Sequence, residues 1–72
     1  MDEIEELVIV GDIVEWQIFD CKPQIRAGET AEVLEIDIIK HDRRWAMLAH
    51  TETGEIFLGM QKFFKVKKHS FR

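Results

Sequence analysis

The sequence of 72 residues predicts a single all-β domain, a small barrel of five strands. Two observations carry this prediction: apolar and polar residues alternate with strand period over short segments, and isolated glycines stand near the predicted strand ends. No linker, internal repeat or low-complexity segment divides the chain. Residues 1–72 are therefore expected to form one domain, with an acidic N-terminal tail over 1–6 and a loose C-terminal tail over 68–72.

The first strand is predicted from Ile13, where Val14, Trp16 and Ile18 fall on one face. It follows a β-branched extended run over 7–10 and a turn or bulge at Gly11 and Asp12. Because Trp16 shares its face with two aliphatic residues, we expect it in the core.

The clearest strand is predicted over residues 29–39. One face would carry Glu32, Leu34, Ile36 and Ile38, and the other would carry Ala31, Val33, Glu35, Asp37 and Ile39. The acids Glu35 and Asp37 indicate that the second face meets solvent. A helix over the same residues is the competing interpretation, but the β-branched, alternating end of the segment favours a strand.

The remaining strands are predicted over 45–51, 55–59 and 63–67. A polar turn over 40–44, a hairpin turn at Thr53 and Gly54, and a single turn over 60–62 separate them. The loop from Asp20 to Gly28 is expected to be exposed and mobile, with Cys21 accessible and Ile25 as its apolar anchor. The predicted core consists of Val14, Leu34, Ile36, Leu48, Ile56, Leu58, Phe64 and Val66.

Composition bounds the functional classes. A single cysteine allows no internal disulfide and favours a reducing compartment, and there is no positively charged leader or long apolar run. We therefore expect a cytoplasmic protein that does not contact a membrane. The three histidines, His41, His50 and His69, are scattered and are expected on the surface or in turns, so no metal site or cofactor is predicted. No catalytic set is recognisable, and a domain of this size leaves little room for a substrate cleft, so we expect no enzymatic activity.

Charge is divided unevenly along the chain. Residues 1–39 carry eleven acidic and two basic side chains, whereas residues 40–72 carry three acidic and eight basic ones. Part of this asymmetry is expected to be internal pairing across strands, and the rest predicts a surface with a basic pole.

The predicted binding surface combines bases and aromatics in the C-terminal half: Arg43, Arg44, Trp45, Lys62, Phe63 and Lys65. Arginine and aromatic residues are enriched at protein-interface hot spots, while bases with exposed rings also bind nucleic acids. The alternative is that Trp45 and Phe63 belong to the core and the bases form a solvated face.

The order of elements resembles the Src-homology-3-like small barrels. Within that class, Gly11, Asp12 and Val14, followed by Gly28, Val33 and Ile36, resemble the KOW pattern of ribosomal and transcription-elongation proteins. The resemblance implies the fold over residues 8–67. Ala31 replaces a second glycine usual in that pattern, and Glu29, Glu32 and Glu35 stand where RNA-binding members are commonly basic. The tyrosine-rich groove of peptide-binding signalling barrels has no counterpart, because the chain lacks tyrosine.

Two functions therefore stand as hypotheses. The first is a non-catalytic protein-interaction module, a small adaptor, subunit or inhibitor that docks on a larger protein, a class that includes viral regulators of host machinery. The second is a KOW-like barrel that binds nucleic acid through its basic C-terminal half. An edge strand in so small a barrel could also pair with a second copy to form a homodimer.

Overall fold

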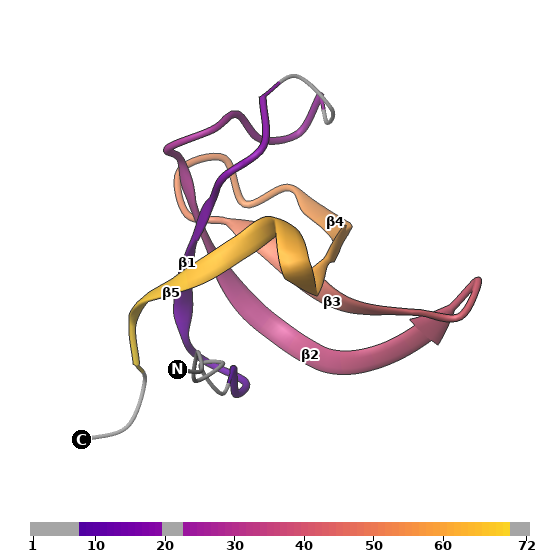
Figure 1. Cartoon of the computed structure of the whole chain (residues 1–72). Coiled ribbons are helices and arrows are strands. Elements are labelled where there is room, and N and C mark those ends of the chain that lie inside the picture. Colours follow the sequence, from indigo (N-terminus) through magenta and orange to yellow (C-terminus); the bar gives the residue numbers. More distant parts are fainter. Residues whose placement is uncertain (1–7, 20–22, 70–72) are drawn as a thin grey trace, which may run out of the picture.

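The computed structural model describes residues 8–19 and 23–69. These form five strands and one turn of 3₁₀ helix: β1 (Ile13–Trp16), β2 (Thr30–Lys40), β3 (Arg43–His50), β4 (Ile56–Met60), η1 (Gln61–Phe63) and β5 (Phe64–Lys68) (Figure 1). The strands pair antiparallel in one sheet with the order β4-β3-β2-β1-β5. The all-β prediction is confirmed, and the competing helix over 29–39 is wrong. The sheet curves around the core, but β4 and β5 are open edges, so the barrel is not closed.

Trp16 lies at the centre of the core with 1% of its surface exposed. Its ring meets Phe57 and Phe63 edge-on, at centroid distances of 6.3 and 5.9 Å, and stacks on Phe64 at 6.3 Å. Gly59 packs directly against the indole, since a Cβ there would lie 2.7 Å from Cζ3 of Trp16. The predicted core position of Trp16 is confirmed.

Two irregularities in β2 overturn the predicted faces of that strand. The pairing with β3 shifts once between Val33 and Glu35 and again between Glu35 and Ile38. A residue inserted on one side of a ladder reverses which face the following residues occupy. Ala31 and Val33, which precede both irregularities, are fully buried, although they were predicted on the solvent face. The first irregularity then turns Ile36 toward the core, so no single alternation describes the whole strand. Leu34 and Ile36 are only partly buried, and Ile36 packs against the core.

The phase of β4 is also the reverse of the prediction. Phe57 is buried, whereas Ile56 is 59% exposed and Leu58 is half-buried. Apolar residues occupy all three positions, so no polar residue in the sequence indicates which side of this strand meets solvent. In β5 and β1 the phase is as predicted: Phe64 and Val14 are buried and Val66 packs on the core.

The loop before β2 is held more firmly than expected. Ile25 is 1% exposed, and the backbone N–H of Gly28 donates to the carbonyl of Trp16 at 2.8 Å. Gly28 adopts a φ of 93°, which favours glycine. Ile25 is therefore the apolar anchor that the sequence predicts, while Pro23, Arg26 and Gly28 of the loop are exposed. Cys21, expected to be accessible, lies outside the described residues.

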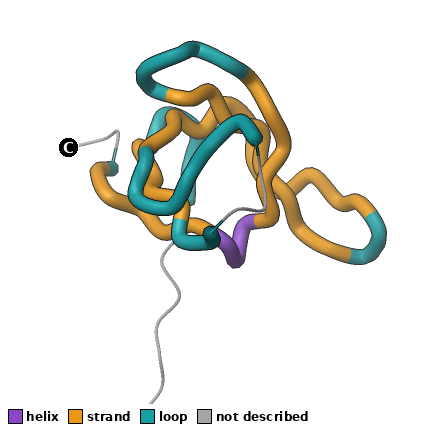
Figure 2. The backbone as a smooth tube through the Cα atoms, turned by 90° about the horizontal axis from the view of Figure 1, so that it is seen from above, coloured by secondary structure: helices purple, strands orange, loops and turns teal. Residues whose placement is uncertain are grey.

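A projecting hairpin connects β2 and β3 (Figure 2). Its loop is shorter than the predicted turn over 40–44, because Lys40 pairs with Arg43 and leaves only two residues between the strands. These residues, His41 and Asp42, have φ values of 54° and 60°. Two successive positive φ angles are typical of a type I′ turn, whose twist matches that of the flanking strands.

Candidate functional site

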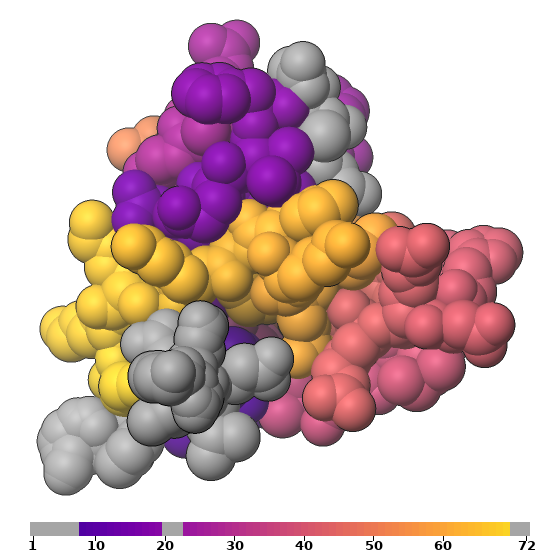
Figure 3. All heavy atoms as spheres, in the orientation of Figure 1, coloured from indigo at the N-terminus to yellow at the C-terminus, as the bar shows by residue number. Residues whose placement is uncertain are grey.

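The predicted basic residues converge on one hollow, which we call the basic hollow. It has a volume of about 910 Å³ and is lined by Arg43 and Arg44 of the projecting hairpin, Lys62 of η1 and Lys65 of β5. These four residues come from three elements, which adjoin on one face in the space-filling view (Figure 3). The other lining residues are Val8, His41, Asp42, Met60, Gln61, Phe64 and Val66. Four of the six predicted site residues therefore surround one space, whose lining includes four apolar side chains.

One contact joins the hairpin to η1, and a second lies within the hairpin at the same residue. The backbone N–H of Asp37 donates to Oε1 of Gln61 in η1 at 2.9 Å. Arg44 Nε lies 3.3 Å from Oδ1 of the same aspartate, and both side chains are mostly exposed. Asp37 has a φ of 59°, at the second irregularity of β2, and this conformation bends the strand where the two contacts form. Asp37 therefore positions one wall of the basic hollow against the other.

The two predicted aromatic residues do not line the hollow. Trp45 is half-buried, and its indole N–H donates to the carbonyl of Lys40 at 3.0 Å. Its neighbour Ala46 faces the core, so Trp45 points to the opposite side of the sheet. Phe63 packs edge-on against Trp16, and the ammonium of Lys62 lies 5.7 Å from the Phe63 ring centroid. The basic hollow thus presents cations and aliphatic groups. Its described lining residues include two rings, the buried phenyl ring of Phe64 and the imidazole of the exposed His41.

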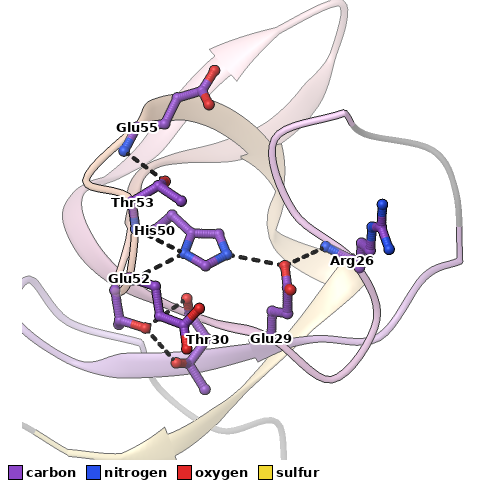
Figure 4. Close-up of polar contacts among 8 residues, drawn as sticks. Arg26, Glu29, Thr30, His50, Glu52, Thr53 and Glu55 are labelled. Carbon is purple, nitrogen blue, oxygen red and sulfur yellow. Dashed lines mark hydrogen bonds and ion pairs between the residues drawn. The ribbon is translucent and has the colours of Figure 1, made fainter.

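A second polar cluster surrounds His50, which is 5% exposed (Figure 4). Its Nδ1 accepts the backbone N–H of Glu52 at 3.0 Å, so the proton of the neutral ring is on Nε2, which donates to Glu29 Oε1 at 2.9 Å. The same carboxylate oxygen accepts the N–H of Arg26. These bonds hold the pKa of Glu29 below its usual value, chiefly through the hydrogen bond from His50.

The cluster has a structural role, because both ring nitrogens of His50 are occupied. It joins the β3–β4 turn to the loop before β2, and Thr30 and Thr51 add a hydroxyl contact of 2.7 Å beside it. The prediction that the histidines lie on the surface or in turns is wrong for His50. Nothing in the local sequence marks it, because its partner Glu29 lies 21 residues away.

A second buried polar residue, Asp12, was also missed. Asp12 is fully buried, and its Oδ2 accepts the backbone N–H of Ile9 at 3.0 Å and lies 3.3 Å from Nδ1 of His69. Lys68 belongs to β5 and His69 contacts Asp12, so these two residues are not part of a loose tail. Residues 1–7 and 70–72, which include most of the predicted tails, lie outside the described residues.

The described part of the chain contains no group of three or more His, Cys, Asp or Glu side chains placed to hold a metal ion. It also contains no helix long and apolar enough to cross a membrane. Searches of protein-family models, curated proteins and solved structures found no match. The Src-homology-3-like and KOW-like resemblance therefore stays a prediction.

Proposed function

We propose that this chain is a non-catalytic protein-interaction module that binds an acidic segment of a larger protein in the basic hollow. The observation that carries the proposal is the convergence of Arg43, Arg44, Lys62 and Lys65 around one space. Asp42 is the only acidic residue that lines it among the described residues. A hollow with this charge favours an anionic ligand, and its aliphatic lining favours apolar side chains between the acids.

The positions of the aromatic residues favour a protein ligand over a nucleic acid. Single-stranded nucleic acids bind by stacking bases on exposed rings beside a basic groove. Here Trp45 lies on the opposite side of the sheet, and Phe63 packs against Trp16. A peptide needs no such rings, because charge-assisted hydrogen bonds and apolar contacts suffice to hold it. The nucleic-acid hypothesis is retained as an outcome of the test below.

Fluorescence anisotropy with two labelled probes tests the proposal. One probe is a peptide of alternating glutamate and leucine, and the other is a single-stranded oligothymidylate. We expect the peptide to bind more tightly, and Lys65→Glu or Arg44→Glu to weaken it at least about tenfold, since each reversal places a like charge beside the ligand. The melting temperature should change little, because exposed charges contribute little to stability.

The matched control is Lys67→Glu. Lys67 lies two residues further along β5, outside the hollow and 4.0 Å from Glu15. Lys67→Glu changes the net charge as much as Lys65→Glu does, so its effect measures only the long-range attraction between the protein and the acidic peptide. An equal loss of binding in the two variants contradicts the proposal. Tighter oligothymidylate binding that falls by about 0.7 log units per log unit of salt for each neutralised phosphate favours the nucleic-acid hypothesis instead.

A further inference from the structure

The side of the sheet that faces away from the core is apolar at its centre. Directly paired residues of antiparallel strands point to the same side. Because Ala46 and Leu48 face the core, Trp45 and Met47 face outward, together with the residues paired to them in β2 and β4. We call this surface the outer face; its apolar members are Ile38, Trp45, Met47, Ala49, Ile56, Leu58 and Met60.

The two ends of the outer face carry opposite charge. Lys40 and Arg43 pair directly at the hairpin end, whereas Glu32 and Glu35, paired with Ala49 and Met47, lie toward the other end. All four charged side chains are exposed. Like charges directly opposite each other in a pair of strands destabilise the pairing, and Lys40 and Arg43 are such a pair. Among the described residues, no ion pair involves either of them. The hairpin end of the face therefore favours an acidic neighbour.

We propose that a second copy of this chain packs on the outer face, sheet against sheet. With a two-fold axis lying in the interface and running across the strands, β2 of each copy lies over β2 of the other in the opposite direction. Lys40 and Arg43 of one copy then face Glu32 and Glu35 of its partner, and the apolar centres meet. A two-fold interface must be complementary to itself, and this distribution of charge meets that requirement.

An interface of standard size would use a substantial share of the surface of this chain. A standard protein interface buries about 800 Å² per partner, which is about a sixth of the 5087 Å² accessible surface of this chain. The outer face spans three of the five strands. Sheets that pack face to face place their inner side chains in a layer about 10 Å thick. From the sequence, a homodimer was possible through an edge strand; the dimer proposed here uses a sheet face instead.

Charge exchange within β2 tests the proposal by sedimentation equilibrium of the full chain. We expect the wild type to form dimers of twice 8.5 kDa at micromolar to millimolar concentration. Glu35→Lys places a lysine against Lys40 of the partner, and Lys40→Glu does the reverse. Each single variant should raise the dimer dissociation constant at least about tenfold. The double variant should recover most of the lost affinity, because the two positions again carry opposite charges, with the signs exchanged.

Glu52→Lys, an exposed change outside the outer face, is the control for net charge and should leave the dissociation constant within about twofold. A wild type that is monomeric throughout this range overturns the proposal, as does a double variant no better than the singles. The proposal does not rest on the proposed function, although Arg43 and Met60 belong to both surfaces. Lys65 lines only the basic hollow, so Lys65→Glu should weaken peptide binding at least about tenfold and leave the dimer intact.

Discussion

Replacing Gly59 by alanine is expected to destabilise the protein, although glycine to alanine in a strand interior ordinarily stabilises it. A Cβ at this position would lie 2.7 Å from Cζ3 and 3.2 Å from Cη2 of Trp16, and 3.1 Å from Cδ1 of Leu48. Both neighbours are fully buried and cannot swing into solvent. Inserting a methyl group into such a core costs about 1–3 kcal/mol, while the reduced freedom of the unfolded chain returns about 0.4–1 kcal/mol.

The net destabilisation is therefore about 1–2 kcal/mol. Urea unfolding measures it directly: with a slope of about 1 kcal/mol per molar for a domain this small, the midpoint should fall by about 1–2 M. Trp16→Phe removes the atoms that clash, so Gly59→Ala should cost less in that background. The double-mutant cycle should give a coupling of at least about 0.5 kcal/mol.

Gly28→Ala is the matched control. A Cβ there meets nothing within 4 Å, but φ is 93°, so its cost is backbone strain of about 1–2 kcal/mol that does not depend on the Trp16 ring. Its effect should add to that of Trp16→Phe. A Gly59→Ala variant as stable as the wild type, or one whose cost is unchanged by Trp16→Phe, would mean that β4 does not pack on Trp16 as described.

Three further predictions concern stability. Phe64→Ala should cost about 3–5 kcal/mol in urea unfolding because it empties the stack on Trp16, whereas Ile56→Ala at its exposed site should stay within about 0.5 kcal/mol; equal costs would mean that the phase of β4 is wrong. The depressed pKa of Glu29 adds stability that is present above its unfolded value, about 4.3, and is lost as the pH falls through the lower folded value. Glu29→Gln should therefore flatten the loss of stability on acidification below about pH 4.3, and an unchanged acid limb would contradict the bond from His50. Asp42→Gly should raise the free energy of unfolding by about 0.5–1 kcal/mol, since glycine relieves the positive φ of the hairpin turn, and a loss of stability would exclude the type I′ geometry.

The alternation of apolar and polar residues predicted correctly which side chains face the core in strands where polar residues occupy one face. In β1 and β5 glutamate or lysine alternates with apolar residues, and Val14, Trp16, Phe64 and Val66 face inward as expected. In β2 the two irregularities change the phase, and no property of Leu34 or Asp37 in the sequence locates them. In β4 three consecutive apolar residues fit either phase.

The structure brings together the four basic residues of the predicted binding surface and separates the two aromatic ones from them. Charge asymmetry indicated Arg43, Arg44, Lys62 and Lys65, and all four line the basic hollow. Arg44 was predicted in a turn that ends before Trp45. The strand begins two residues earlier, at Arg43, so Arg44 and Trp45 are successive strand residues and point to opposite faces. Buried His50 depends on pairing across the fold, which local sequence does not encode.

The central claim, that the basic hollow is the binding surface, is tested most directly by mapping peptide binding onto ¹⁵N-labelled protein by NMR. On titration with the glutamate-leucine peptide, we expect the largest amide shifts at Arg43, Arg44, Lys62 and Lys65, and little change at Lys67 or Thr53. The shifts should saturate together and weaken as salt rises, because exposed charges are screened. Shifts centred on the outer face, or spread evenly over all lysines and arginines, would contradict the claim.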